Sequence, residues 1–231
     1  MYKIEPHLHT ACVSRCGKLD AEALAAGYHA AGYHAIAVTD HYNVDTWKHL
    51  GVEPVTVDDV MPYFMQGYRQ MQAACAPYGI TVYLGAELRF YECENDYLFY
   101  GFDPALLAHP HEIMDMGIAR FSALARQTGG LLLQAHPFRK TCVPVAPMLL
   151  DGVEVFNANP RHMHHNHNEL AWALAEREGA SFVRTAGSDC HQTPDIARSG
   201  ILSPILPQDS MAFAALLRSG RYELIYPPEQ A

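Results

Sequence analysis

The chain has 231 residues, of which 49% are hydrophobic and 18% are charged, so it has enough apolar side chains for a packed core and is not intrinsically disordered. Its formal net charge of -9, without any run of Lys or Arg, argues against a long nucleic acid as the main ligand. No segment resembles a signal peptide or reaches the roughly 20 apolar residues that span a membrane, and the six cysteines include no Cys-x-x-Cys pair. We therefore expect a cytoplasmic protein with reduced thiols and no membrane contact.

Short apolar segments alternate along the chain with helical patterns. In chain order, the expected strands are residues 2–5, 35–38, 80–84, 97–102, 131–133, 153–156 and 182–183. The expected helices are residues 21–31, 58–76, 112–128, 168–178 and 208–219, each followed by a glycine or a proline. Such alternation is typical of parallel strands that are joined by right-handed crossovers. The tail from Tyr226 onward is expected to be frayed.

The fold class depends on what stands at the ends of these strands. Six of the seven expected strands carry a residue of the metal-ligand type at or just beyond the C-terminal end, and residues 97–102 are the exception, because Asp96 comes before the strand. In a parallel barrel these ends meet at one mouth, whereas in an open sheet they spread along an edge. We therefore expect a single α/β domain over residues 1–231, built as a closed barrel.

Histidine and carboxylate side chains are concentrated at the strand ends. His7 and His9 are two residues apart, so in a strand both imidazoles lie on the same face. Mixed imidazole and carboxylate sets bind divalent metal ions in proteins. Helix capping would account for Asp40 but not for the histidine beside it. The expected metal ligands at the strand ends are His7, His9, Asp40, His41, Glu87, His136, Asp189 and His191.

The order of these residues resembles the PHP family, the polymerase and histidinol phosphatase superfamily. The matching motifs are His7-Leu8-His9-Thr10, Val38-Thr39-Asp40-His41, Gly85-Ala86-Glu87, Ala135-His136-Pro137 and Gly187-Ser188-Asp189-Cys190-His191. The resemblance covers residues 7–191, which is most of the chain. It implies a distorted seven-stranded (β/α)7 TIM-like barrel with two or three divalent metal ions (Zn, Mn or Fe) at the C-terminal ends of the strands. It also implies the hydrolysis of phosphate esters.

The resemblance assigns five of the ligands to two metal positions. His7, His9 and Asp189 would hold the first metal ion. Glu87 would bridge this ion to a second one, which His136 would also bind. The catalytic residues that the resemblance implies are Glu87, Asp189 and His191.

A third metal position depends on residues that depart from the family pattern. His41 and His191 would serve it, with Asp40 as a further ligand or as a hydrogen-bonding partner of one. Asp96 stands where many members have a histidine, and we expect it to bind the second metal ion. Arg15 stands where some members have another histidine, so the number of metal ions, two or three, is left open.

The expected function is the hydrolysis of a small phosphate monoester, such as a histidinol-phosphate-like compound or a nucleotide, by a metal-activated water. The arginines expected to bind the phosphate are Arg139, Arg15 and Arg198. One alternative is a PHP module that binds metal without catalysis. Another is an amidohydrolase-type barrel, which also begins with His-x-His but usually has a bridging lysine, and no expected strand here ends in lysine. The sequence leaves the oligomeric state open.

Overall fold

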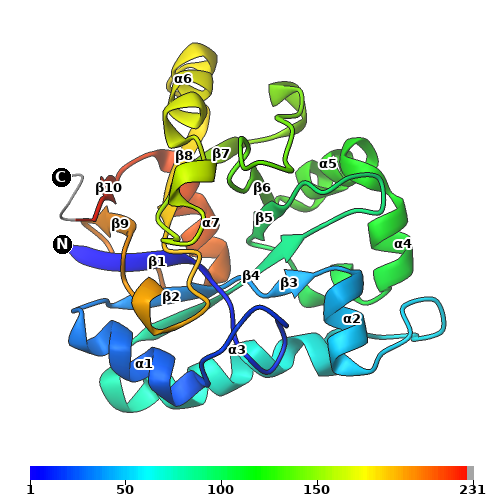
Figure 1. Ribbon diagram of the computed structural model, residues 1–231, viewed down its shortest axis with the longest axis horizontal. Helices are drawn as coiled ribbons and strands as arrows, with labels where there is room; N and C mark the ends of the chain where they lie inside the picture. Colours follow the sequence, from blue (N-terminus) through cyan, green and yellow to red (C-terminus); the bar gives the residue numbers. More distant parts are fainter. Residues whose placement is uncertain (228–231) are drawn as a thin grey trace.

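The computed structural model describes residues 1–227. In this part of the chain, ten strands form one mixed sheet (Figure 1). The strands are β1 (Tyr2–Leu8), β2 (Ala35–Val38), β3 (His41–Tyr42), β4 (Thr81–Leu88), β5 (Tyr97–Tyr100), β6 (Leu131–Gln134), β7 (Gly152–Asn157), β8 (Val183–Gly187), β9 (Gly200–Ser203) and β10 (Glu223–Ile225). The order along the sheet is β10-β9-β1-β2-β4-β5-β6-β7-β8, and β3 pairs with β4 outside this path. All seven expected strands are therefore present, and β3, β9 and β10 are additional.

The sheet curls until β8 comes back to β1. The backbone N–H of Cys190, just beyond β8, donates to the carbonyl of His7 (3.3 Å), and the N–H of His9 donates to the carbonyl of Cys190 (3.1 Å). These bonds make a parallel bridge between Leu8 and Cys190. The sheet is thus a nearly closed barrel, which confirms the expected α/β architecture in outline.

The strand β5 runs against both of its neighbours. It is antiparallel to β4 and β6, while β1–β2, β2–β4, β6–β7 and β7–β8 are parallel pairs. The prediction of parallel strands throughout is therefore wrong for β5, whose fully buried residues form a pattern that is the same in either direction. Residues 89–96 join β4 to β5 as a loop, so the (β/α)7 alternation is not kept there. The reversal also brings Asp96 to the end of the barrel where the other strands finish.

Helices cover the outside of the barrel. They are α1 (Ala21–Ala30), α2 (Val44–Leu50), α3 (Met61–Cys75), α4 (Pro110–Asp115), α5 (Gly117–Thr128), α6 (Asn168–Glu178) and α7 (Ser210–Ser219). Single 3₁₀ turns occur at η1 (Ala76–Tyr78), η2 (Pro104–Leu107), η3 (Pro147–Leu149), η4 (Met163–His165) and η5 (Thr193–Asp195). In Figure 1, α1 and α3 lie side by side below the sheet, and α4 and α5 cover the opposite side from the two termini. The helix α2 lies in a segment for which the sequence patterns predict no helix.

The helix expected over residues 112–128 is two helices, and Gly117 explains the break. Gly117 has φ +64°, and a Cβ there would lie 2.4 Å from Glu92 Oε2. Glu92 instead approaches the backbone and accepts a hydrogen bond from the N–H of Ile118 (2.7 Å). The carboxylate thus serves the N-terminus of α5, where the helix dipole favours negative charge.

An aromatic cluster under β3 fixes the strand that carries His41. Tyr42 makes edge-on contacts with Trp47 of α2 (4.7 Å between ring centroids) and with Phe64 of α3 (5.5 Å). All three rings are buried, and the Tyr42 hydroxyl donates to the carbonyl of Leu107 (2.7 Å). Fully buried aromatic side chains contribute several kcal/mol each to a core, so β3 is held firmly against the two helices.

The C-terminal segment is only partly described. The ring of Tyr226 packs edge-on against Phe156 (4.9 Å), so the expectation of fraying is wrong for that residue. The remainder of the expected frayed tail, residues 228–231, lies outside the described part of the chain. Within residues 1–227, no helix combines the length and apolar character needed to cross a bilayer.

Candidate metal centre

Glu87 lies in the middle of a group of histidines where the strands end. It is the penultimate residue of β4 and is almost fully buried. Its Oε1 lies 3.1 Å from His136 Nε2 and 3.4 Å from His7 Nε2. Its Oε2 lies 2.9 Å from His41 Nδ1 and 3.3 Å from His9 Nε2. Each carboxylate oxygen therefore faces two imidazole nitrogens, which is the arrangement of a ligand shared by two metal ions.

Asp189 joins this group from the loop that follows β8. Its Oδ1 lies 3.0 Å from His191 Nε2, 3.2 Å from His9 Nε2 and 3.5 Å from His7 Nε2. Its Oδ2 instead accepts a hydrogen bond from Arg139 Nη2 (2.7 Å). One oxygen thus faces the imidazoles, while the protein holds the other.

The arrangement of these atoms fits divalent metal ions. Among residues 1–227, the buried atoms His41 Nδ1, Glu87 Oε2 and His191 Nε2 have no hydrogen-bond partner, although each lies near an atom of the group. An unpaired buried polar atom costs about 1–3 kcal/mol, and a shared cation would remove that cost. Bonds of about 2.0–2.2 Å place the ligand atoms of a tetrahedral site about 3.4 Å apart, close to the spacings around Glu87 and Asp189.

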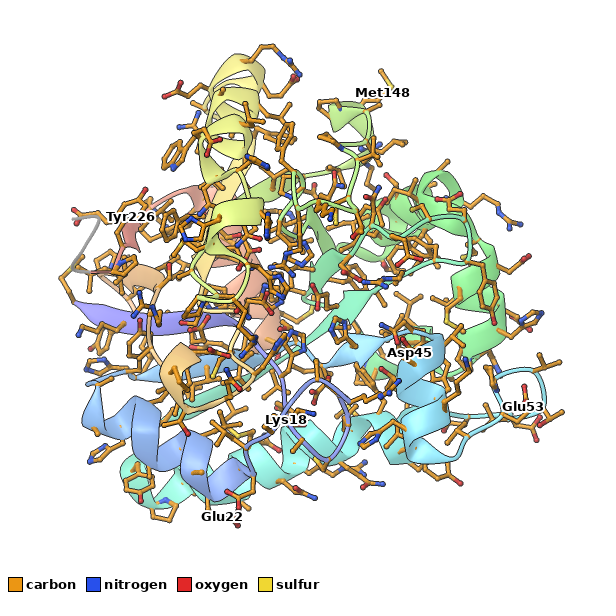
Figure 2. The ribbon with its side chains drawn as sticks, in the orientation of Figure 1. Lys18, Glu22, Asp45, Glu53, Met148 and Tyr226 are labelled. Atoms are coloured by element: carbon orange, nitrogen blue, oxygen red, sulfur yellow. The ribbon has the colours of Figure 1, made fainter. Side chains whose placement is uncertain are left out.

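The electrostatics of the group also favour bound cations. Burial alone would raise the pKa of Glu87, but His41 and His7 hold it well below its usual range. The pKa of Asp189 is likewise low, because His191, His7 and Arg139 outweigh its burial. Burial and the neighbouring His41 lower the pKa of His9 to about 3, so this imidazole is neutral, the form that binds metal. Burial also acts to lower the pKa values of His7 and His41, but Glu154 and Glu87 raise the pKa of His7 and Glu87 raises that of His41, so a metal ion would displace protons that these imidazoles hold. Figure 2 shows nitrogen-bearing side chains gathered near the centre of the view, above Lys18.

A known protein family matches most of the chain. The PHP domain family matches residues 5–179. The chain belongs to the PHP family. We call the group of His7, His9, His41, Glu87, His136, Asp189 and His191 the PHP centre. The family match ends before Asp189 and His191, so these two residues are included because of the distances given above. A search of curated proteins finds no match.

Solved structures share the fold at low sequence identity. PsfC from Pseudomonas syringae is 18% identical, with a TM-score of 0.67 over 99% of this chain and 92% of that one. A two-domain protein from Bacteroides vulgatus, containing a predicted PHP-like metal-dependent phosphoesterase, is 14% identical (TM-score 0.64, 98% of this chain and 65% of that one). An amidohydrolase from Chromobacterium violaceum is 14% identical (TM-score 0.54, 99% of both chains). At these identities the likeness concerns the fold alone.

Glu154 is a residue of the PHP centre that sequence reasoning missed. It is 1% exposed, and its Oε1 lies 2.9 Å from His7 Nδ1. Its Oε2 accepts hydrogen bonds from the N–H of His136 (3.1 Å) and from Asn157 Nδ2 (2.9 Å). A carboxylate on Nδ1 keeps the proton there and turns the lone pair of Nε2 toward a metal. A glutamate inside the buried strand β7 was the available signal. Asn157, the last residue of β7, donates from Nδ2 to Glu154 Oε2 and to Asp189 Oδ2 (3.2 Å).

Replacing Glu154 with glutamine should weaken metal binding. The amide nitrogen of Glu154→Gln would face either the donors of His136 and Asn157 or the donor of His7, so at least one of these hydrogen bonds is lost. Loss of such an orienting partner costs about 10–100-fold in metal affinity. Zinc titration of the metal-free variant against a competing chelator measures this change. Glu176→Gln, on the exposed surface of α6, is the control, and equal affinities for the two variants would contradict the role given to Glu154.

Two candidate ligand residues of the PHP centre have strained backbones. His136 has φ 29° and Asp189 has φ 48°, in the left-handed region that costs a non-glycine residue about 1–3 kcal/mol. Gly187 provides the close approach between β8 and β1, because a Cβ at Gly187 would lie 2.6 Å from His7 Cβ. Backbone strain and close packing at the ligands are typical of sites whose geometry serves function rather than stability.

Asp40 supports the ligands from behind. Its Oδ1 accepts hydrogen bonds from the N–H of Thr10 and from Ser14 Oγ, and its Oδ2 accepts one from Thr10 Oγ1, all at 2.7 Å. Ser14 Oγ in turn accepts the N–H of His41 (2.9 Å). Gly67 of α3 makes room for this carboxylate, since a Cβ there would lie 2.2 Å from Asp40 Oδ2. With both oxygens occupied, the geometry favours the hydrogen-bonding role over direct metal ligation, the two roles that the sequence left open for Asp40.

Asp96 reaches the mouth of the barrel but is bound by an arginine. Arg89 donates from Nε to Asp96 Oδ1 (2.8 Å) and from Nη2 to Oδ2 (2.7 Å). Asp96 Oδ2 also lies 3.9 Å from His136 Nε2, and an Asp96 oxygen lies within 4.8 Å of ligand atoms of His41 and Glu87. Its position agrees with the expected second metal, and its ligation stays a prediction.

Two arginines are engaged with the ligands. Arg139 donates to Asp189 Oδ2 and from Nε to Asn166 Oδ1 (2.8 Å), and its side chain is only 15% exposed. These contacts favour a role for Arg139 in holding Asp189, rather than the contact with a substrate phosphate that the sequence predicts. Arg161 lies with Nη2 2.7 Å from His191 Nδ1 and pairs with Asp195 (2.9 Å).

The other two expected phosphate ligands lie in different surroundings. Arg15 is exposed and lines a pocket beside His41. Arg198 is half-buried in the segment before β9, and its contact with substrate stays a prediction.

Cys16, in the loop between β1 and α1, lies beside three of these histidines. A ligand atom of Cys16 and one each of His9, His41 and His191 lie within 4.8 Å of one another. Burial raises the pKa of the Cys16 thiol, but contacts with His41 and His191 outweigh this and lower it to about 7.

Proposed function

We propose that this PHP protein is a metal-dependent hydrolase that acts on a small phosphate monoester. The observation that carries the proposal is the position of Glu87, whose two oxygens each face two imidazole nitrogens. A pair of metal ions that share a carboxylate is a recurrent solution for phosphoryl transfer, because together they can stabilise the attacking and leaving oxygens.

The residues of the chain have separate tasks in this proposal. Metal ions bound at the centre would supply Lewis acidity and lower the pKa of a water molecule. Glu87 and Asp189 provide the anionic ligands, and Arg139 keeps one Asp189 oxygen turned away from the imidazoles. His41 and His191, whose side chains are 18% and 11% exposed, lie nearer to solvent than His7 and His9, so a metal ion that they hold would face an approaching substrate.

The pocket next to this centre supports a small substrate. It has a volume of about 270 Å³, and its lining includes His41, Arg15 and Arg89. Cys16 and Asp45 also line it, and Figure 2 labels Asp45 near the start of α2. Arg89 is fixed by Asp96, so Arg15 is the guanidinium free to follow a substrate phosphate. The net charge of -9 adds to the case against a long nucleic acid.

Replacing Arg15 with alanine should raise KM with a smaller effect on kcat. A charge-assisted hydrogen bond contributes about 1.5–3 kcal/mol, which corresponds to a rise in KM of roughly tenfold or more for a phosphate monoester. Steady-state kinetics measure this change. Lys48→Ala, an exposed cation on α2, is the control for a general loss of positive charge, and an equal effect of both changes would contradict a specific contact.

The proposed function is tested with a panel of substrates on the metal-loaded protein. The panel holds sugar, amino-alcohol and nucleoside monophosphates, a phosphodiester, a DNA oligonucleotide and a lactam. The proposal expects phosphate release from one class of monoester, and its loss on treatment with a chelator. Turnover of the lactam alone would favour the amidohydrolase reading, turnover of the oligonucleotide alone would favour a nuclease, and bound metal without any turnover would favour a non-catalytic module.

A further inference from the structure

Cys16 approaches the PHP centre together with three histidines from different parts of the chain. His9 follows β1, His41 lies in β3, and His191 follows β8. One ligand atom of each, with the Cys16 sulfur, falls inside a sphere where all separations are below 4.8 Å. The rings are also closely packed, since His9 stacks on His41 (4.4 Å between centroids) and tilts against His191 (4.7 Å). Four such donors form a group of the size and composition of a zinc site.

The loop that carries Cys16 is built to hold the sulfur in this place. The N–H of Ser14 donates to the carbonyl of Thr10 (2.9 Å), and the N–H of Gly17 donates to that of Ser14 (3.0 Å). A Cβ at Gly17 would lie 2.7 Å from the Thr10 carbonyl carbon, so the residue after Cys16 must be very small for the loop to fold back. The N–H of Lys18 then donates to the carbonyl of His191 (2.7 Å), which ties the loop to the strand end that provides a histidine.

We propose that Cys16 is a thiolate ligand of a metal ion that His41 and His191 also bind, beside the position held by His7, Glu87 and His136. The position held by His7, Glu87 and His136 has only nitrogen and oxygen donors, whereas the position of Cys16 includes sulfur. Soft thiolate ligands favour zinc or iron over manganese and magnesium. The Cys16 position should therefore select zinc or iron, while the neighbouring position accepts a wider range of ions.

This inference rests on the proposed function only in needing a metal ion at the centre, and it does not depend on the substrate. X-ray absorption at the zinc edge measures it directly on the zinc-loaded protein, because Zn–S bonds are about 2.3 Å and Zn–N bonds about 2.0–2.1 Å long. The wild-type protein should show a sulfur shell, which Cys16→Ser should lose. The affinity of Cys16→Ser for the zinc ion held by His41 and His191 should also be lower than that of the wild type by about tenfold or more.

Two further variants guard against an indirect effect. Cys12→Ser changes a neighbouring half-buried cysteine whose sulfur contacts Thr10 Oγ1 (3.4 Å), and it should keep the sulfur shell. Cys16→His should bind zinc as tightly as the wild type, but with nitrogen and oxygen scattering alone. A sulfur shell that persists in Cys16→Ser, or a zinc-loaded wild type without sulfur, overturns the role of Cys16 and leaves the proposed function standing. Failure of the wild type to bind metal at all overturns both.

Discussion

Replacing Glu87 with glutamine is expected to reduce phosphatase activity by at least about 100-fold and to lower the metal content of the protein. Both carboxylate oxygens face imidazoles, at 3.1 and 3.4 Å on one side and at 2.9 and 3.3 Å on the other. Glutamine keeps the shape but has one neutral oxygen and one N–H donor, so it cannot bridge two cations. The measurement is kcat/KM on the best monoester, with metal analysis of the same sample.

A matched control lies a few residues away. Glu94 pairs with Arg89 Nη1 (2.9 Å), and its side chain is 67% exposed. Glu94→Gln should leave activity and metal content close to those of the wild type, because an exposed pair contributes little. If Glu87→Gln kept activity within twofold of this control, Glu87 would not be the bridging ligand.

The change Asp189→Asn is expected to have an effect of similar size on activity, with an added loss of stability. One Asp189 oxygen faces three imidazoles at 3.0–3.5 Å, and the other accepts hydrogen bonds from Arg139 (2.7 Å) and Asn157 Nδ2 (3.2 Å). In either orientation, an asparagine places its N–H₂ group against the imidazoles or against the guanidinium. Activity should fall by at least about 100-fold. The free energy of unfolding of the metal-free protein should fall by about 1–3 kcal/mol, because Arg139 loses its anionic partner.

Denaturation of the metal-free proteins separates this effect from metal loss. Asp20→Asn is the control, since Asp20 caps α1 by accepting the N–H of Ala23 (2.8 Å) and asparagine caps equally well. It should match the wild type in both assays. Full activity in Asp189→Asn would show that Asp189 is not a ligand, and an unchanged unfolding free energy would show that its bond to Arg139 adds no stability.

The sequence was sufficient to predict the candidate ligands that stand at strand ends. His7 and His9 share a face of β1 because alternate residues of a strand point the same way, and Glu87, His136 and Asp189 each follow or end a buried strand. These positions follow from local pattern and from the convergence of strand ends in a barrel. The structure places all five together.

Other features depend on contacts that no local pattern contains. The reversal of β5 was not visible, because a fully buried strand has the same apolar pattern in either direction. Cys16 reaches the histidines only because Gly17 lets its loop fold back, and Arg139 holds Asp189 from a segment 50 residues away. Glu154 was missed because its partner His7 lies in the first strand, far along the chain.

The most direct test of the central claim is a crystal structure of the metal-loaded protein, with diffraction data collected on both sides of the metal's absorption edge. We expect at least two anomalous peaks about 3.5–4 Å apart, with Glu87 between them and His7, His136 and Asp189 as neighbours. Strong metal peaks found only elsewhere, for example at His164 and His165 of η4, with none beside Glu87, would contradict it.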